Sequence, residues 1–186
     1  MSYIPPAVVK AWICTLDDSA YSRDVPKQFK LKYGNELVYN LDKIASGYIR
    51  KLYGNKSISS SDALKIKGDD LFFIEFKNQP QSNVNSEDVQ AKALASLLVL
   101  QIALFPEKSL SEISQKSHFY VIYKDSTLGN NDYYQKTVNK LGDFAKVVDE
   151  PILFGLRHHM EAGLYNDIHT IPVSIFEEKY STGIFE

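Results

Sequence analysis

Several features of secreted, membrane-bound or zinc-binding proteins are missing from this chain of 186 residues. Its single cysteine, Cys14, excludes both a disulfide within the chain and a cysteine-rich zinc site. The N-terminus has no charged segment followed by an apolar one, so no signal peptide is expected. The most apolar run, residues 93–105, is shorter than the roughly 20 residues that a membrane span needs. These absences together predict a cytoplasmic protein that makes no contact with a membrane.

An excess of one charge is missing as well. Lys and Arg number 21 against 23 Asp and Glu, so no overall positive field attracts nucleic acid, although a local basic groove stays open. We find no glycine-rich phosphate loop, nucleophile elbow or helix-turn-helix signature. What is present, 44% apolar and 24% charged residues, is typical of a globular protein. The length favours a single domain over residues 1–186 with a substantial core.

Helical and extended patterns alternate along the chain, which predicts an α/β fold: a mixed sheet with a central β-hairpin and helices on its faces. Residues 1–30 are interpreted as an N-terminal extension, and a loop at 78–83 separates the hairpin from the next helix. The main elements are expected at residues 36–53 (an amphipathic helix), 62–77 (the hairpin), 86–105 (a helix that is buried in its C-terminal half) and 118–124 (a strand).

Residues 125–186 are interpreted as a C-terminal addition of helices and a strand. Helices are expected at 133–148 and 151–164, and a last strand at 171–176. The sequence indicates no particular function for this addition, which we expect to supply substrate contacts.

The hairpin carries the most informative residues. Gly68-Asp69 is its natural corner, because Gly adopts the positive φ that a two-residue loop requires. Pairing Lys67 with Asp70 then places Asp62 opposite Glu75. Since side chains alternate along a strand, Glu75 and Lys77 share the sheet face of Asp62.

Two carboxylates that face each other repel, and unpaired charges at the end of a buried strand are costly. A divalent cation between Asp62 and Glu75 would remove this repulsion, and hard oxygen ligands suit Mg²⁺ or Mn²⁺. Lys77 would then point at whatever the metal holds. The alternative is that Asp62 lies in a serine-rich loop and Glu75 forms an ordinary ion pair with Lys65 or Lys77, which would contribute little.

In these residues the chain resembles the PD-(D/E)XK nuclease superfamily. That family carries an Asp on the hairpin and Glu/Asp-x-Lys on the next strand, as Asp62 and Glu75-Phe76-Lys77 do here with twelve residues between Asp62 and Glu75. The resemblance covers roughly residues 32–124 and implies an αββαβ core of the restriction-endonuclease-like fold. Ser61 stands where the family often has proline.

The resemblance implies a Mg²⁺-dependent endonuclease that hydrolyses phosphodiester bonds of DNA rather than RNA. Asp62, Glu75 and the backbone carbonyl of Phe76 would hold one or two metal ions, and Lys77 would orient the attacking water or offset charge on the phosphate. The products would carry a 5′-phosphate and a 3′-hydroxyl. Related nucleases often dimerise, so a homodimer or a protein partner fits this expectation.

Two further residues are candidates by the same resemblance. Glu36, in the first turn of the expected helix 36–53, would be an additional metal ligand, and Gln90, or alternatively Lys92, would lie near the site from the next helix. Each also has an ordinary explanation, because acidic residues favour helix N-termini and polar residues occupy the solvated first turn of a helix. His158 and His159 are adjacent and point apart, so they do not match a helical zinc pair.

Two rival hypotheses remain at this point. The fold could serve a catalytically silent protein that binds a partner, as an immunity or accessory module does, and the acidic balance favours this interpretation. Intact Asp62, Glu75 and Lys77 argue against it. Alternatively, an α/β protein of unrelated function could carry a hairpin that mimics the motif.

Overall fold

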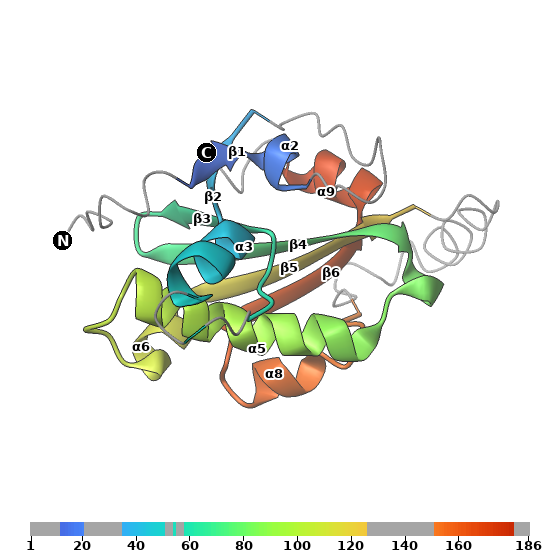
Figure 1. The fold of residues 1–186 in the computed structure, drawn as a ribbon. Coiled ribbons are helices and arrows are strands. Elements are labelled where there is room, and N and C mark those ends of the chain that lie inside the picture. The colour runs from blue at the N-terminus through green and yellow to red at the C-terminus, as the bar shows by residue number, and fades with distance from the viewer. Residues whose placement is uncertain (1–11, 21–34, 51–53, 55–57, 126–150, 181–186) are drawn as a thin grey trace.

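The computed structural model describes residues 12–20, 35–50, 54, 58–125 and 151–180. These residues form a mixed sheet of six strands in the order β1-β2-β3-β4-β5-β6, with helices on both faces (Figure 1). The pairs from β1 to β4 are antiparallel, and the pairs β4–β5 and β5–β6 are parallel. The strands are β1 (Ile13–Thr15), β2 (Leu37–Asn40), β3 (Ala63–Lys67), β4 (Asp70–Pro80), β5 (Ser117–Lys124) and β6 (Asp167–Pro172).

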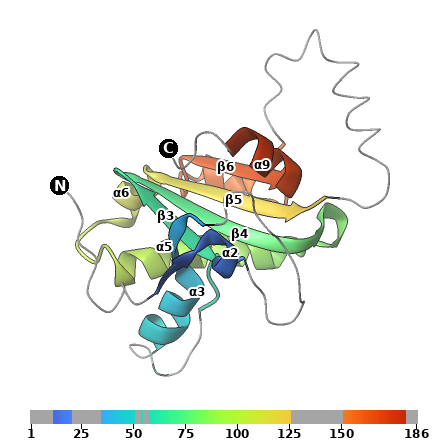
Figure 2. The same cartoon turned by 90° about the horizontal axis from the view of Figure 1, so that it is seen from above.

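The described helices lie on two sides of this sheet (Figures 1 and 2). We call the side that carries the longest helix the α5 face and the other the α9 face. The helices are α2 (Leu16–Ser19), α3 (Leu41–Ile44), the π-helix η1 (Ala45–Ile49), the 3₁₀ turn η2 (Gln81–Asn83), α5 (Ser86–Ala103), α6 (Leu110–Ser114), α8 (Arg157–Glu161) and α9 (Val173–Tyr180). None of them is both long and apolar enough to cross a membrane.

The β3–β4 hairpin has the predicted register. Lys67 pairs with Asp70 and Leu64 with Phe73, and Gly68 at the corner has a φ of 61°. The long strand β4 continues past β3 and pairs with β5 on its other side, so the hairpin lies at the centre of the sheet. The prediction of an α/β fold with a mixed sheet and a central hairpin is confirmed.

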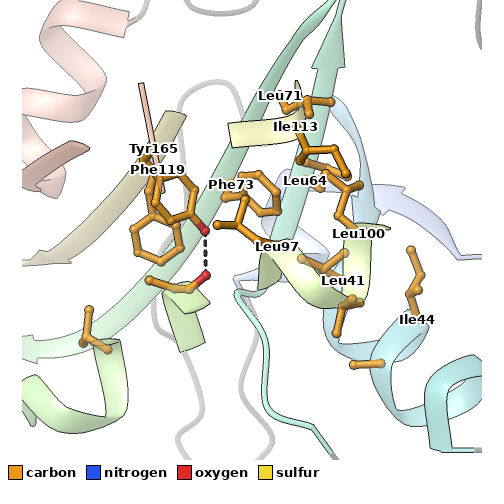
Figure 3. Packing of buried hydrophobic residues seen from close by; sticks show 14 of the residues in the cluster. Leu41, Ile44, Leu64, Leu71, Phe73, Leu97, Leu100, Ile113, Phe119 and Tyr165 are labelled. Carbon is orange, nitrogen blue, oxygen red and sulfur yellow. Dashed lines mark hydrogen bonds between the residues drawn. The ribbon is translucent and has the colours of Figure 1, made fainter. Parts of the chain in front are cut away.

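Each face of the sheet has its own apolar cluster. On the α5 face, Phe73 and Phe119 contact the ring of Tyr165, whose hydroxyl donates to the carbonyl of Ala93 in α5 at 2.7 Å (Figure 3). Leu97 and other residues of α5 pack on the same cluster. On the α9 face, the cluster joins the sheet to α2 and α9 through Ala63, Ile74, Ile122, Ile171, Leu16 and Phe176.

The prediction of one helix over residues 36–53 was wrong at its beginning. Residues 37–40 form strand β2, in which Val38 and Asn40 are buried at a period of two while Leu37 is exposed. Asn40 then ends the strand, because its side chain accepts the amide of Lys43 at 2.9 Å and caps α3. Tertiary pairing of β2 with β1 and β3 therefore outweighs the helical spacing of the apolar residues.

The next helix and strand agree with prediction in position. Asn85 caps α5 by accepting the amides of Glu87 and Asp88, and β5 spans the expected 118–124. The C-terminal half of α5 is largely buried, as expected, although Leu98 and, near the middle of the helix, Leu94 are exposed. The predicted loop at 78–83 begins later, since β4 extends to Pro80.

The outer parts of the chain differ more from prediction. Residues 13–19, taken as part of an extension, contribute β1 at the edge of the sheet and α2. The helix expected at 151–164 is reduced to α8, and the strand expected at 171–176 lies earlier, as β6, with α9 following it. The helix expected at 133–148 falls outside the described residues.

Candidate metal and catalytic site

The candidate site lies where β4 continues beyond its ladder with β3. Asp62 occupies a bend just before β3, and its Oδ2 accepts the backbone amide of Phe76 at 2.7 Å. The Asp62 side chain therefore takes the place of the next backbone hydrogen bond of the hairpin. Since N–H and C=O of one strand residue point to the same edge, the carbonyl of Phe76 also faces the Asp62 edge of β4.

Glu75 is the buried centre of the site. Its side chain is 1% exposed and lies on the α5 face of β4. Its Oε1 accepts two ammonium groups, from Lys77 at 3.0 Å and from Lys92 of α5 at 2.8 Å. Among the residues that the structure describes, no donor reaches its Oε2. An unpartnered carboxylate oxygen in a buried position is costly, and it marks the place where a cation or donor fits.

The surroundings of Asp62 and Glu75 make ionisation of both carboxyl groups less favourable. Burial first, and then the charge of Glu75, raise the pKa of Asp62 well above its ordinary value. Burial also raises the pKa of Glu75, although Lys92 and Lys77 oppose this effect. A bound cation would stabilise both carboxylates in their charged forms.

The two ammonium groups are held in their charged forms. Burial alone would lower the pKa of Lys77, but Glu75 and Asp88 outweigh it and the pKa is raised. The pKa of Lys92 is raised in the same way, because the charges of Glu75 and Asp62 outweigh its burial. Both lysines therefore act as cations at neutral pH.

Helix α5 supplies the wall of the site. Asp88 and Lys92 are four residues apart and share one helix face, where Asp88 binds Lys77 and Lys92 binds Glu75. A buried serine pair attaches this wall to the Asp62 bend: Ser96 Oγ accepts the amide of Ser61 at 2.8 Å and donates to the carbonyl of Lys92 at 2.7 Å. The position of Asp62 relative to α5 thus depends on serine side chains that the sequence did not single out.

Glu36 does not join this site, which corrects the expectation that it lies on the first helix as a ligand. It precedes β2 and pairs with Lys65 at 2.7 Å. Asn40 pairs with Ala63, next to Asp62, and Glu36 lies four residues earlier, roughly 13 Å along the strand. The error follows from the helix boundary, since the helix begins at Leu41 and not at residue 36.

Asp42 is an acidic residue of α3, the helix that replaces the expected helix 36–53, and the sequence analysis did not identify it. It lies in the first turn of α3, and its Oδ1 accepts the hydroxyl of Ser60 at 3.2 Å. Its charge acts on both Asp62 and Lys92. The signal that could have identified it is Asn40, because an Asn two residues before an Asp is typical of a helix N-terminus.

Gln90 points away from the carboxylates. Its Nε2 donates to the carbonyl of Phe154 at 3.0 Å, in the segment that precedes α8. The alternative candidate, Lys92, is the residue of α5 that reaches Glu75. Two helix positions separate Gln90 from Lys92, which rotates their side chains to different sides of α5.

The histidines lie apart from this site. His158 contacts Glu161 at 3.5 Å in α8, and His169 contacts Asp167 at 2.9 Å in β6. In the described part of the chain, no three side chains of His, Cys, Asp or Glu are grouped closely enough to hold a metal ion.

The residues present nevertheless fit Mg²⁺ or Mn²⁺. Asp62 and Glu75 offer hard carboxylate oxygens, and Glu75 Oε2 lacks a partner among the described residues. Mg²⁺ is commonly bound through one or two carboxylates and completes its shell with water and substrate phosphate, so a site of this size suits it. The carbonyl of Phe76 would be the third protein ligand.

Comparisons with known proteins assign no function to the chain, so a functional proposal depends on the geometry of the site. No family model, no curated protein and no solved structure matches the chain.

Proposed function

We propose that this protein is a Mg²⁺-dependent endonuclease of the PD-(D/E)XK type that hydrolyses phosphodiester bonds of DNA. The observation that carries the proposal is the buried Glu75 on the central strand, joined to Lys77 and close to Asp62, with one carboxylate oxygen that no described residue binds. In a purely structural ion pair, a buried carboxylate oxygen without a partner only destabilises the fold. A carboxylate that binds a metal ion, in contrast, needs an oxygen that no other group occupies.

The arrangement of elements supports a restriction-endonuclease-like fold. From α3 onward the chain runs through the hairpin β3–β4, then α5 and then β5, which lies parallel to β4. This αββαβ order is the one that the family resemblance implies. It brings the three motif residues to one end of the hairpin, beside the N-terminal half of α5.

Asp62, Glu75 and the carbonyl of Phe76 would hold the metal. When bound, the cation would polarise the phosphodiester and lower the pKa of a coordinated water. The remaining steps belong to the chain itself. Because Lys77 stays protonated, it serves as a donor to the phosphate oxygens in the transition state and not as a general base.

The metal site is tested first, by calorimetric titration of the metal-free protein with Mn²⁺. Wild type should bind the ion, whereas Glu75→Gln should lose most of the heat because an amide is a poor substitute for the buried carboxylate. The exposed Glu107 provides the matched control, since Glu107→Gln should titrate like wild type. Equal heats for wild type and Glu75→Gln would show that Glu75 does not bind the metal ion, which would disprove the proposed site.

Activity is tested by incubation with supercoiled plasmid and short single strands, with and without Mg²⁺. Lys77→Met should lower the cleavage rate about 100- to 1000-fold, the usual loss when one transition-state donor is removed. Lys116 is exposed and lies before β5, away from the site, so Lys116→Met should cut at the wild-type rate. Cleavage that survives Lys77→Met unchanged would exclude the proposed mechanism.

A catalytically silent, partner-binding protein is the second candidate. The exposed Leu94 and Leu98 favour it, because they lie four residues apart on α5 and give this helix an apolar outer stripe. The two candidates differ in a simple result: a silent protein would show no Mg²⁺-dependent cleavage of any substrate while still binding a partner, and Leu94→Ser with Leu98→Ser would weaken that binding.

A further inference from the structure

Lys92 occupies an unusual place for a helix lysine. Its side chain is 15% exposed and its ammonium lies 2.8 Å from Glu75 Oε1, so it extends into the site instead of toward solvent. Its backbone carbonyl accepts the hydroxyl of Ser96, which is fully buried and also bonds to Ser61 beside Asp62. The helix that carries Lys92 is thus attached to the same bend that carries Asp62.

Two ammonium groups already lie at the centre of the site. Lys77 and Lys92 reach the same oxygen of Glu75, Oε1, at 3.0 Å and 2.8 Å. Asp88 is bound to Lys77 at the rim. Two divalent cations would add four positive charges beside these two ammonium groups, and mutual repulsion would oppose the second ion.

The two oxygens of Glu75 are used differently. Oε1 carries both ammonium groups, and Oε2 has no partner among the described residues. In two-metal sites the ions lie about 3.5–4 Å apart and share carboxylate ligands. Glu75 Oε2 and Asp62 would hold one ion here, whereas the ammonium groups of Lys77 and Lys92 already occupy the position beside Oε1.

We propose that the site binds a single divalent cation and that Lys92 supplies the second positive charge that another metal ion would otherwise provide. This inference rests on the proposed nuclease function and assigns the metal number of the same site. Lys92 would offset the negative charge of the scissile phosphate from the α5 side, while Lys77 acts from β4.

The number of bound ions tests this directly. The metal-free chain of 186 residues is titrated with Mn²⁺, and free Mn²⁺ is measured by electron paramagnetic resonance. We expect one bound ion per chain in wild type. Two ions on wild type would overturn the assignment of Lys92 and leave the metal site intact, whereas no bound ion would overturn both the assignment and the proposed function.

The variant Lys92→Met removes the charge and keeps most of the length of the side chain. We expect it to bind Mn²⁺ about tenfold more tightly than wild type, because an ammonium beside Glu75 repels the incoming ion. Cleavage should nevertheless fall about 100-fold, since the charge that offsets the phosphate is lost. A lysine with a merely structural role would change stability but not the affinity for Mn²⁺.

A second substitution guards against loss of folding. Lys92→Arg keeps the positive charge, and we expect it to retain one ion and affinity within about threefold of wild type. Lys116→Met, which removes an exposed lysine, should match wild type in both ion count and affinity. Unchanged Mn²⁺ affinity in a folded Lys92→Met protein would overturn the inference.

Discussion

The environment of Glu75 is the main indication of a functional site in this molecule. A carboxylate that is 1% exposed should be either neutral or fully paired, yet only one of its oxygens has partners among the described residues. Asp62 adds a second carboxyl group whose pKa is raised by burial and by Glu75. Two acids held in this state destabilise the fold unless a cation is bound, which is a cost characteristic of functional sites.

The pH dependence of stability should reveal this cost. In the unfolded chain Asp62 titrates near 3.8, and in the folded chain its pKa is higher, so between these values the folded state binds more protons. The free energy of unfolding therefore falls as pH rises through this window and stays lower above it. We expect Asp62→Asn to be more stable than wild type at pH 7 in EDTA, and the difference to shrink toward pH 4.

Urea unfolding at a series of pH values provides the measurement. Asp69→Asn, at the exposed hairpin corner, is the matched control and should follow wild type. Millimolar Mg²⁺ should raise the stability of wild type at pH 7 but not that of Asp62→Asn, because ligand binding to the folded state stabilises it. A stability difference that does not depend on pH would contradict a raised pKa of Asp62 in the folded state.

The segment before α8 shows how a helix and a strained turn fit each other. Phe154 has a φ of 57° and Gly155 a φ of 70°, a left-handed pair that brings the backbone against Gln90 of α5. A Cβ on Gly155 would lie 2.5 Å from Gln90 Nε2. The positive φ favours glycine here, and a side chain on this residue would force the amide of Gln90 to move.

Gly155→Ala should therefore destabilise the protein by more than the conformational cost alone. Gly163 is the matched control, since its φ is 71° and a Cβ added there would meet no atom within 4 Å. We expect Gly163→Ala to cost about 1–2 kcal/mol, and Gly155→Ala a further 1–3 kcal/mol, roughly, from steric overlap.

Chemical denaturation of the two single variants measures this difference. The excess cost of Gly155→Ala should disappear when Gln90→Ala is the background, because the overlapping amide is then removed. Equal costs at Gly155 and Gly163 would mean that Gln90 moves aside freely.

The sheet joins two apolar clusters into one fold. The cluster on the α5 face includes Leu97 and Phe73, and the cluster on the α9 face includes Ile171 and Ile74. Phe73 and Ile74 are neighbours on β4 and point to opposite faces of the sheet, so a different set of helices covers each face of this strand. Loss of packing on one face should therefore destabilise the other.

Leu97→Ala and Ile171→Ala test this cooperativity. Each residue is at most 2% exposed, so each truncation should cost about 2–5 kcal/mol. Both variants should unfold in a single transition, with far-UV circular dichroism and tyrosine fluorescence giving the same midpoint. Separate transitions for the two probes would show that the faces unfold independently.

Local sequence patterns were sufficient to predict the elements at the centre of the molecule. The register of the hairpin, the corner at Gly68 and the start of α5 at Asn85 follow from turn chemistry, side-chain alternation and capping, all of which act within a few residues. The shared face of Glu75 and Lys77 follows from the same alternation, and the structure brings their charged groups within 3.0 Å.

Long-range contacts were needed for the rest. The sequence could not show that residues 37–40 pair with two strands, and so it placed Glu36 on a helix and overlooked Asp42. Nor could it choose between Gln90 and Lys92, because that choice depends on which side of α5 meets β4. Residues near in sequence determine turns, caps and alternation, whereas the partners of a strand or helix face lie tens of residues away and are set only when the whole sheet assembles.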